Sequence, residues 1–314
     1  MPETGALSIV IPAKAGIYHP PGGQCLNHRD TAENGDDRSA GCKSPEPGGL
    51  LMSTRLRRCV VRHACLAVGM AGWFVALTSG ALARPVKTET ITFRSGDETV
   101  SAYLAVPDSA GPYPAVVVIH EWWGLNDWVK EEAQKFAEQG YLALAVDLYR
   151  GKVAYDPNLA HELSRGLAQD QALRDLKAAF SYLASRPDVQ KDKIGSVGWC
   201  MGGGFSLLLA VHEPKLAACV VNYGSMPTDK DEIQRIQAPV LGNFGAEDRG
   251  ITPSAVEAFE GAMKAAHKSI DVKIYDGAGH AFENPNNKLG YREAAANDAW
   301  ARTLAFLSRT LKGE

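Results

Sequence analysis

Cys200 lies at the centre of a short glycine-rich segment, Gly198-Trp199-Cys200-Met201-Gly202, which has the pattern Gly-x-nucleophile-x-Gly. Apolar residues typical of a strand precede the segment, and an apolar run typical of a helix follows it. A sharp strand-to-helix turn would expose the sulfur near the positive end of the helix dipole, which favours a thiolate nucleophile. A structural turn that holds a buried cysteine would give the same local pattern, so the rest of the chain has to decide between a nucleophile and a structural cysteine.

An acid and a histidine follow in the order that such a nucleophile requires. Asp248 comes after an apolar strand expected over residues 238–244, and His280 comes after an alternating strand expected over residues 270–276. Either residue alone could be a cap or turn residue. Nucleophile, acid and histidine is, however, the chain order of α/β-hydrolases, and an open α/β sheet carries its site at the carboxyl ends of its strands. Because a thiol needs a base, and the base needs a carboxylate to orient it, we predict a catalytic triad.

Several motifs resemble those of the dienelactone hydrolase family, and the resemblance covers the chain from about residue 88 to its C-terminus. The matching segments are His120-Glu121-Trp122-Trp123-Gly124, Asp147-Leu148-Tyr149-Arg150, Gly198-Trp199-Cys200-Met201-Gly202-Gly203, Gly245-Ala246-Glu247-Asp248 and Gly279-His280-Ala281-Phe282. The resemblance implies that Cys200, His280 and Asp248 form the triad.

The same resemblance implies further roles near the nucleophile. Glu121 matches the family glutamate that hydrogen-bonds the resting thiol and takes its proton when substrate binds. The backbone amides of Trp122 and Met201 match the oxyanion hole. Trp123, beside them, is expected to line the substrate pocket.

The family's best-studied type holds an anionic substrate with two arginines, and only one position matches here. Arg150 follows the Asp-Leu-Tyr motif, but Glu283-Asn284-Pro285 stands where the second arginine is expected. We therefore expect cleavage of small esters or lactones through a thioester, without a preference for an anionic dienelactone. A thiol redox or peroxide-handling protein and a non-catalytic hydrolase-like binding protein are the alternatives.

Strand-like and helix-like segments alternate along the chain, which predicts the α/β-hydrolase fold: a doubly wound, mostly parallel sheet of about eight strands, without a large cap domain. We expect strands near residues 88–95, 100–106, 114–120, 141–147, 193–199, 216–223, 238–244 and 270–276. We expect helices near residues 127–139, 168–185, 201–212, 253–266 and 290–311.

The first third of the chain has a different composition. Residues 1–51 are rich in Gly, Pro, Asn and Asp, which predicts disorder, and the signal peptide that follows them predicts that they are a mis-assigned N-terminal extension, because signal peptides begin at the N-terminus. Residues 52–83 contain a basic segment, an apolar segment and Ala81-Leu82-Ala83, which together predict a signal peptide that starts at Met52 and is cleaved after Ala83. A retained membrane anchor is the alternative. A periplasmic or secreted enzyme domain would then span residues 84–314.

Composition adds few constraints beyond these. The chain has 314 residues, is 45% hydrophobic and 22% charged, and has a net charge of −3. No basic stripe indicates nucleic-acid binding, and no membrane contact is expected after cleavage of the signal peptide. Cys200 and Cys219 are the cysteines that remain in the mature chain, and we expect no disulfide between them. Neither a cofactor nor a metal ion is expected, and the protein is expected to be a monomer or a small homo-oligomer.

Overall fold

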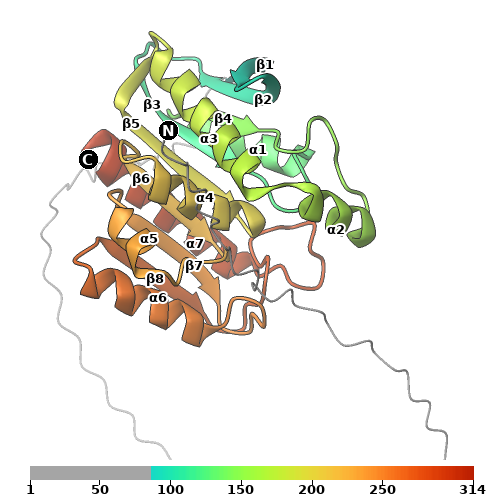
Figure 1. The fold of residues 1–314 in the computed structure, drawn as a ribbon, viewed down its shortest axis with the longest axis vertical. Helices are drawn as coiled ribbons and strands as arrows, with labels where there is room; N and C mark the ends of the chain where they lie inside the picture. The colour runs from blue at the N-terminus through green and yellow to red at the C-terminus, as the bar shows by residue number, and fades with distance from the viewer. Residues whose placement is uncertain (1–85) are drawn as a thin grey trace, which may run out of the picture. The chain divides into compact units, whose positions relative to one another are not determined.

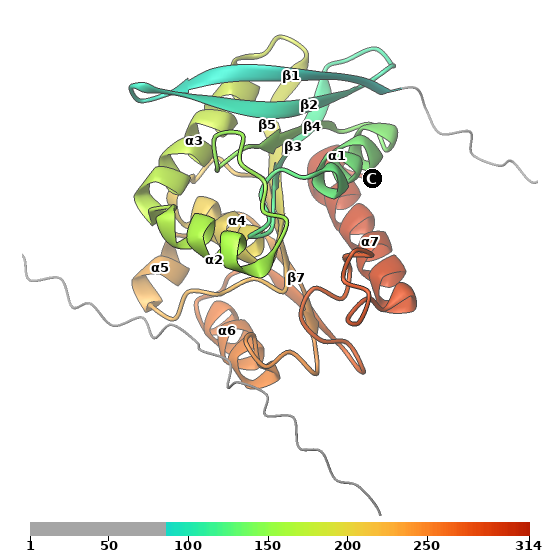
Figure 2. The same ribbon diagram turned by 90° about the vertical axis from the view of Figure 1, so that its right-hand side faces the viewer.

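A computed structural model describes residues 86–314, in which a single sheet separates two layers of helices (Figures 1 and 2). The predicted extension and signal peptide at residues 1–83 lie outside the described residues. The strands are β1 (Val86–Ser95), β2 (Glu98–Pro107), β3 (Tyr113–Ile119), β4 (Leu142–Val146), β5 (Val189–Trp199), β6 (Ala218–Asn222), β7 (Val240–Gly245) and β8 (Ile270–Tyr275). The helices are α1 (Asp127–Glu138), α2 (Pro157–Gly166), α3 (Gln169–Ser185), α4 (Met201–His212), α5 (Lys230–Arg235), α6 (Pro253–Ala265) and α7 (Glu293–Leu307), followed by the π-helical turn η1 (Ser308–Lys312).

The sheet has the strand order β1-β2-β4-β3-β5-β6-β7-β8. β1 and β2 form an antiparallel hairpin, and β2 pairs antiparallel with β4. From β4 to β8 all neighbouring strands are parallel, so their carboxyl ends meet at one edge. The chain crosses from β3 to β4 on one side and from β4 back to β5 on the other, which creates the switch point at which such sheets carry their sites.

The central strand β3 is buried along its whole length, as expected for a strand covered on both faces. Its residues alternate between two apolar cores. Ala115, Val117 and Ile119 face the core formed with α3, α4, α5 and α6, whereas Val116 and Val118 face the core formed with α1 and α7. Figure 2 shows these two helix layers on opposite sides of the sheet.

The predicted fold class is confirmed, and two helices were missed. α2 begins at Asp156, whose carboxylate accepts hydrogen bonds from the amides of Asn158 and Leu159, but only Ala160 of this helix is buried. α5 is a single short turn that buries Ile233. α2 does have an amphipathic pattern, with Leu163 packed against the core, so this helix was missed although its pattern was present, whereas α5 is too short to show an apolar stripe of helical period. Within residues 86–314, no helix combines the length and the hydrophobicity that crossing a membrane requires.

Candidate active site

Cys200 lies on a tight turn between β5 and α4, with φ 54° and ψ −118°. This is a left-handed conformation that a residue with a side chain rarely adopts, and such strain concentrates at functional positions. The turn is possible because glycines surround it. A Cβ atom on Gly198 would lie 2.0 Å from the carbonyl oxygen of Gly202, and one on Gly202 would lie 2.3 Å from the carbonyl oxygen of Ile119. The amide of Cys200 donates to the carbonyl oxygen of Asn222 and holds the turn against β6.

His280 lies between Cys200 and Asp248. Its Nε2 is 3.0 Å from the Cys200 sulfur, and its Nδ1 is 2.7 Å from Oδ2 of Asp248. The other carboxylate oxygen of Asp248 accepts hydrogen bonds from the amides of Gly250 and Ile251, which fix its orientation. Residues that are 80 and 32 positions apart in sequence therefore meet at the carboxyl edge of the sheet.

The surroundings of His280 favour its protonated form. Burial lowers the pKa of this imidazole, but the hydrogen bonds and negative charges of Asp248 and Cys200 outweigh burial and raise the pKa above its usual value. Its side chain is 41% exposed, so solvent screens part of this attraction. The pKa of Asp248 is lowered, because hydrogen bonds from His280, Ile251 and Gly250 outweigh its burial. His280 is thus placed to accept a proton from the thiol and to hold it beside a carboxylate.

Glu121 follows β3 and is buried, with one hydrogen bond to each carboxylate oxygen. Asn284 donates its side-chain amide to Oε2 at 2.7 Å, and the Tyr223 hydroxyl donates to Oε1 at 3.4 Å. The thiol of Cys200 is bonded to His280 instead of Glu121. Burial raises the pKa of Glu121 to about 7, even though Asn284, Tyr223 and the charge of His280 act in the opposite direction. The carboxyl group can therefore gain or lose a proton near neutral pH.

Asn284 and Tyr223 were not identified as site residues from the sequence. Asn284 was noted only because it occupies the region of the missing arginine, and its side chain instead turns inward to Glu121. Tyr223 follows β6 with φ 39°, and its ring centroid lies 5.3 Å from that of His280. Its position at the end of the strand predicted over residues 216–223, at the edge where Cys200 and His280 lie, was the available indication.

The two predicted oxyanion-hole amides come from adjoining segments. Met201 is the first residue of α4, where a backbone amide has no partner within the helix. Trp122 follows Glu121 in the turn closed by the hydrogen bond from the Gly124 amide to the Glu121 carbonyl oxygen. The close approach of Gly202 to the end of β3 brings these two segments together.

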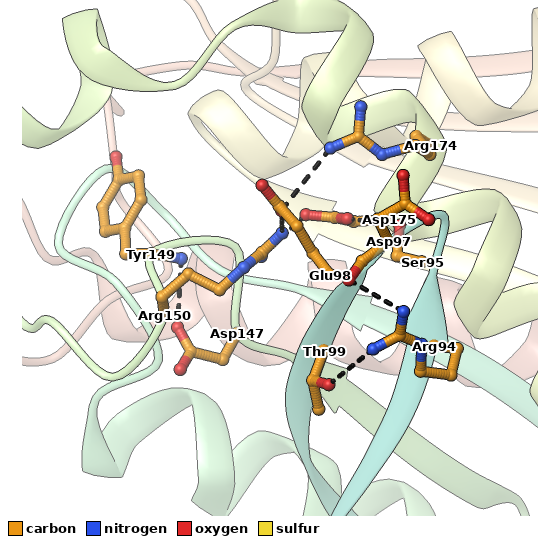
Figure 3. A network of polar contacts seen from close by, with 10 residues as sticks. All are labelled: Arg94, Ser95, Asp97, Glu98, Thr99, Asp147, Tyr149, Arg150, Arg174 and Asp175. Carbon is orange, nitrogen blue, oxygen red and sulfur yellow. Dashed lines mark hydrogen bonds and ion pairs between the residues drawn. The ribbon is translucent and has the colours of Figure 1, made fainter.

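Arg150 is already paired with protein carboxylates. One terminal nitrogen lies 2.6 Å from Glu98 and the other lies 2.7 Å from the buried Asp175, which also accepts a hydrogen bond from Ser95. Figure 3 shows the Arg150 guanidinium beside Glu98 and Asp175, while the ring of the preceding residue, Tyr149, points away from them. A substrate carboxylate would have to compete with two acidic side chains for this arginine.

Trp123 and Tyr149 lie on the loops around the site. The ring of Trp123 packs against that of Trp122 with 4.9 Å between centroids. Tyr149 donates its hydroxyl hydrogen to the sulfur of Met201 at 3.4 Å, and it also lines a cavity of about 310 Å³ together with Leu163 and Leu167. Tyr149 therefore links the residue after the nucleophile to a space large enough for a small molecule.

The remaining thiol has a different environment. Cys219 is fully buried in β6, its sulfur lies 3.3 Å from the Ser206 hydroxyl, and burial raises its pKa to about 11. Cys200 and Cys219 are both free thiols. In the part of the chain that the structure describes, no cluster of three or more His, Cys, Asp or Glu side chains is arranged to hold a metal ion.

The strand order, the helices on both faces and the position of Cys200 on a strand-to-helix turn are those of the α/β-hydrolase class. Comparison with known proteins narrows this class. A model of the dienelactone hydrolase family matches residues 100–311. A Saccharolobus solfataricus protein named as a carboxymethylenebutenolidase is 33% identical over 261 residues, which are 71% of this chain and 98% of that protein.

Two further relatives agree with this match. A Bradyrhizobium protein named as a 2-oxo-3-(5-oxofuran-2-ylidene)propanoate lactonase is 33% identical, with coverage of 72% of this chain and 98% of that protein. A Klebsiella pneumoniae crystal structure named as a dienelactone hydrolase is 31% identical with a TM-score of 0.66, and the match covers 72% of this chain and 99% of that one. The chain belongs to the dienelactone hydrolase family and is an ester or lactone hydrolase similar to the carboxymethylenebutenolidases.

Proposed function

We propose that this protein hydrolyses small neutral esters or lactones with Cys200 as the nucleophile, His280 as the general base and Asp248 as the group that orients the base. The observation that carries the proposal is the pair of contacts on His280, 3.0 Å to the sulfur and 2.7 Å to the carboxylate. A base bonded to a nucleophile on one nitrogen and to a carboxylate on the other is the arrangement that nucleophilic acyl transfer uses.

In the acylation step, Nε2 of His280 takes the thiol proton and the sulfur attacks the carbonyl carbon. The amides of Trp122 and Met201 then stabilise the tetrahedral oxyanion, with roughly 3 kcal/mol for each donor. When this intermediate collapses, the C–O bond breaks, the leaving oxygen takes the proton from His280, and a thioester remains on Cys200.

In the deacylation step, His280 removes a proton from a water molecule, whose oxygen attacks the thioester carbonyl. The carboxylic acid leaves and the sulfur recovers its proton from His280. Asp248 stabilises the imidazolium at both stages, because its carboxylate stays bonded to Nδ1.

Glu121 acts on His280 through charge in this scheme. Asn284 and Tyr223 each donate a hydrogen bond to its carboxylate. The positive charge of His280 favours the ionised form of Glu121, and ionised Glu121 therefore favours the imidazolium form of His280. This role differs from the direct proton transfer that the family resemblance implies for Glu121.

The preference for neutral substrates follows from the two positions at which the family's best-studied type has arginines. Arg150 is neutralised by Glu98 and Asp175, and Asn284 carries no charge. The cavity of about 310 Å³ beside Tyr149 has room for a small molecule.

The deciding experiment compares the variants Cys200→Ala and Cys219→Ala in hydrolysis of p-nitrophenyl acetate. We expect Cys200→Ala to lose at least about a thousandfold in kcat/KM, because the loss of a triad nucleophile removes several powers of ten. Cys219→Ala removes the other thiol and should keep near-normal activity. Acid quenching of the wild type during turnover, followed by mass spectrometry, should detect an acetyl group on the peptide that contains Cys200.

Folded Cys200→Ala that keeps more than about a tenth of the wild-type kcat/KM would contradict the proposed nucleophile. Consumption of peroxide by the wild type without ester hydrolysis would instead favour a thiol redox protein.

A further inference from the structure

A second cavity lies on the other face of the sheet, between α1, α7 and the loop that follows β8. Its volume is about 300 Å³, and neither Cys200 nor His280 lines it. Four aromatic side chains form much of its wall: Trp128, Trp199, Tyr291 and Trp300. Trp128 and Trp199 pack edge to face with 5.4 Å between their centroids, so the wall is a fixed aromatic surface.

Two carboxylates enter the same cavity. Glu283 accepts a hydrogen bond from the indole of Trp199 on Oε2 at 3.0 Å, and its Oε1 is buried with no hydrogen-bond partner within residues 86–314. Glu132, on α1, is buried and pairs with Lys135 at 2.7 Å. Lys135 also lines the cavity, so two carboxylates, Glu283 and Glu132, share it with one basic side chain.

Trp128 is 4% exposed, and its indole N–H interacts with the carboxylate of Glu132, so the Glu283 oxygen is the group that calls for a partner from outside the protein. Burial of a polar atom without a partner destabilises a protein by about 1–3 kcal/mol. Since the unpaired Glu283 oxygen belongs to a residue that lines the cavity, a bound molecule with an N–H donor can supply the hydrogen bond that the described residues do not.

Electrostatics indicate the charge of that molecule. Burial raises the pKa of Glu283 well above its usual value, the hydrogen bond from Trp199 opposes this, and the charges of Glu132 and Glu121 add to it. These surroundings favour the neutral carboxylic acid of Glu283, and a cation in the cavity would favour its ionised form. Aromatic faces attract cations as well, and the attraction increases when water is excluded.

We propose that this cavity binds a small organic ammonium ion, which donates an N–H hydrogen bond to Oε1 of Glu283 and lies against the rings of Trp199 and Trp300. The site is separate from the triad, and the proposal does not depend on the hydrolytic mechanism. Trp199 directly precedes the nucleophile and Glu283 comes three residues after His280, so an occupant would contact the segments that carry Cys200 and His280.

The test is a calorimetric titration of the purified protein with benzylamine, which is a cation at neutral pH, and with benzyl alcohol, which is of similar size and uncharged. We expect saturable binding of benzylamine at least about tenfold tighter than that of benzyl alcohol, with a change in tryptophan fluorescence. Glu283→Gln should weaken benzylamine binding by about 10- to 150-fold and leave the benzyl alcohol affinity almost unchanged.

The matched control is Glu257→Gln, which removes the same charge from an exposed position on α6 and should not alter binding. Trp300→Leu provides a second variant that keeps Glu283 and removes one aromatic face, and it should also weaken benzylamine binding. Equal affinity for the two probes, equal binding by wild type and Glu283→Gln, or no saturable binding of benzylamine would each overturn the proposal.

Discussion

Glu121 is a buried carboxylate that becomes charged near neutral pH. Its pKa rises from its usual 4.5 to about 7 because of burial, despite the hydrogen bonds from Asn284 and Tyr223. Between these two pH values the folded protein binds more protons than the unfolded chain. The free energy of unfolding therefore falls as the pH rises through this range, by up to roughly 3 kcal/mol from this residue.

We predict that Glu121→Gln removes this loss. A glutamine can accept the hydrogen bond from Asn284 without ionising, so stability at pH 8 relative to pH 5 should improve by roughly 2–3 kcal/mol compared with the wild type. Urea unfolding at the two pH values measures the difference. Glu131→Gln, at an exposed position on α1, is the control and should behave like the wild type.

The same variant should have lower activity. Without the negative charge of Glu121, the imidazolium at His280 loses part of its stabilisation, so kcat should fall and the pH dependence of Cys200 alkylation by iodoacetamide should change around pH 7. Identical alkylation profiles and identical kcat would show that Glu121 does not act on the triad.

For single residues, the sequence could identify the three members of the proposed triad but not the side chains that hydrogen-bond to Glu121. Cys200, Asp248 and His280 follow strands in a recognisable order, and parallel strands bring such positions to one edge. Asn284 could not be identified as the partner of Glu121, because an asparagine in a polar loop has many uses and the 163-residue separation carries no pattern.

The turn between β5 and α4 is the element on which the geometry of Cys200 depends. We predict that Gly198→Ala destabilises the protein by on the order of 3 kcal/mol and reduces kcat/KM more than tenfold, because the new methyl group would lie 2.0 Å from the backbone of Gly202. Gly261→Ala in α6 is the matched control. Nothing lies within 4 Å of its added methyl group, so it should stabilise the protein by about 0.5–1 kcal/mol.

Urea midpoints of both variants test this prediction, and a Gly198→Ala protein as stable as Gly261→Ala would refute it. Strongly apolar elements were predictable: α4, which is apolar on all sides, extends over Met201–His212 where residues 201–212 were expected. α2 and α5 were missed, because capping by Asp156 and Asp229 defines them more than burial does.

At the scale of the whole chain, the N-terminal prediction concerns residues outside the described structure. The basic segment, apolar segment and Ala81-Leu82-Ala83 predict a mature protein that begins at Arg84. N-terminal sequencing of protein from the periplasmic or secreted fraction measures this directly. Unprocessed chain confined to the cytosol would contradict the prediction, and unprocessed chain in membranes would support the retained anchor.

The β1–β2 hairpin joins the sheet through the pairing of β2 with β4, and the acidic and basic side chains of Figure 3 connect it further to α3 and to the loop that carries Arg150. Arg150, which precedes α2, reaches Glu98 on β2 and Asp175 on α3, and Asp175 also accepts a hydrogen bond from Ser95 on β1. One guanidinium therefore connects segments that are distant in sequence. The sequence motif suggested a substrate role for Arg150 because it could not show that the hairpin supplies two competing groups.

We predict that Arg150→Ala lowers the free energy of unfolding by about 2 kcal/mol, because it leaves the buried carboxylate of Asp175 without its cation. The side chain of Arg150 is 28% exposed, so water partly replaces it and the loss is smaller than for a fully buried pair. Arg174→Ala is the control, since Arg174 is 3.5 Å from Glu98 and more exposed, and it should lower the free energy of unfolding by less than about 1 kcal/mol.

If Arg150 only connects the hairpin, Arg150→Ala should change the ratio of kcat/KM for a neutral lactone to that for a carboxylate-bearing dienelactone by less than about threefold. A selective loss of activity toward the anionic lactone, with unchanged stability, would show that Arg150 leaves its two carboxylates to bind substrate.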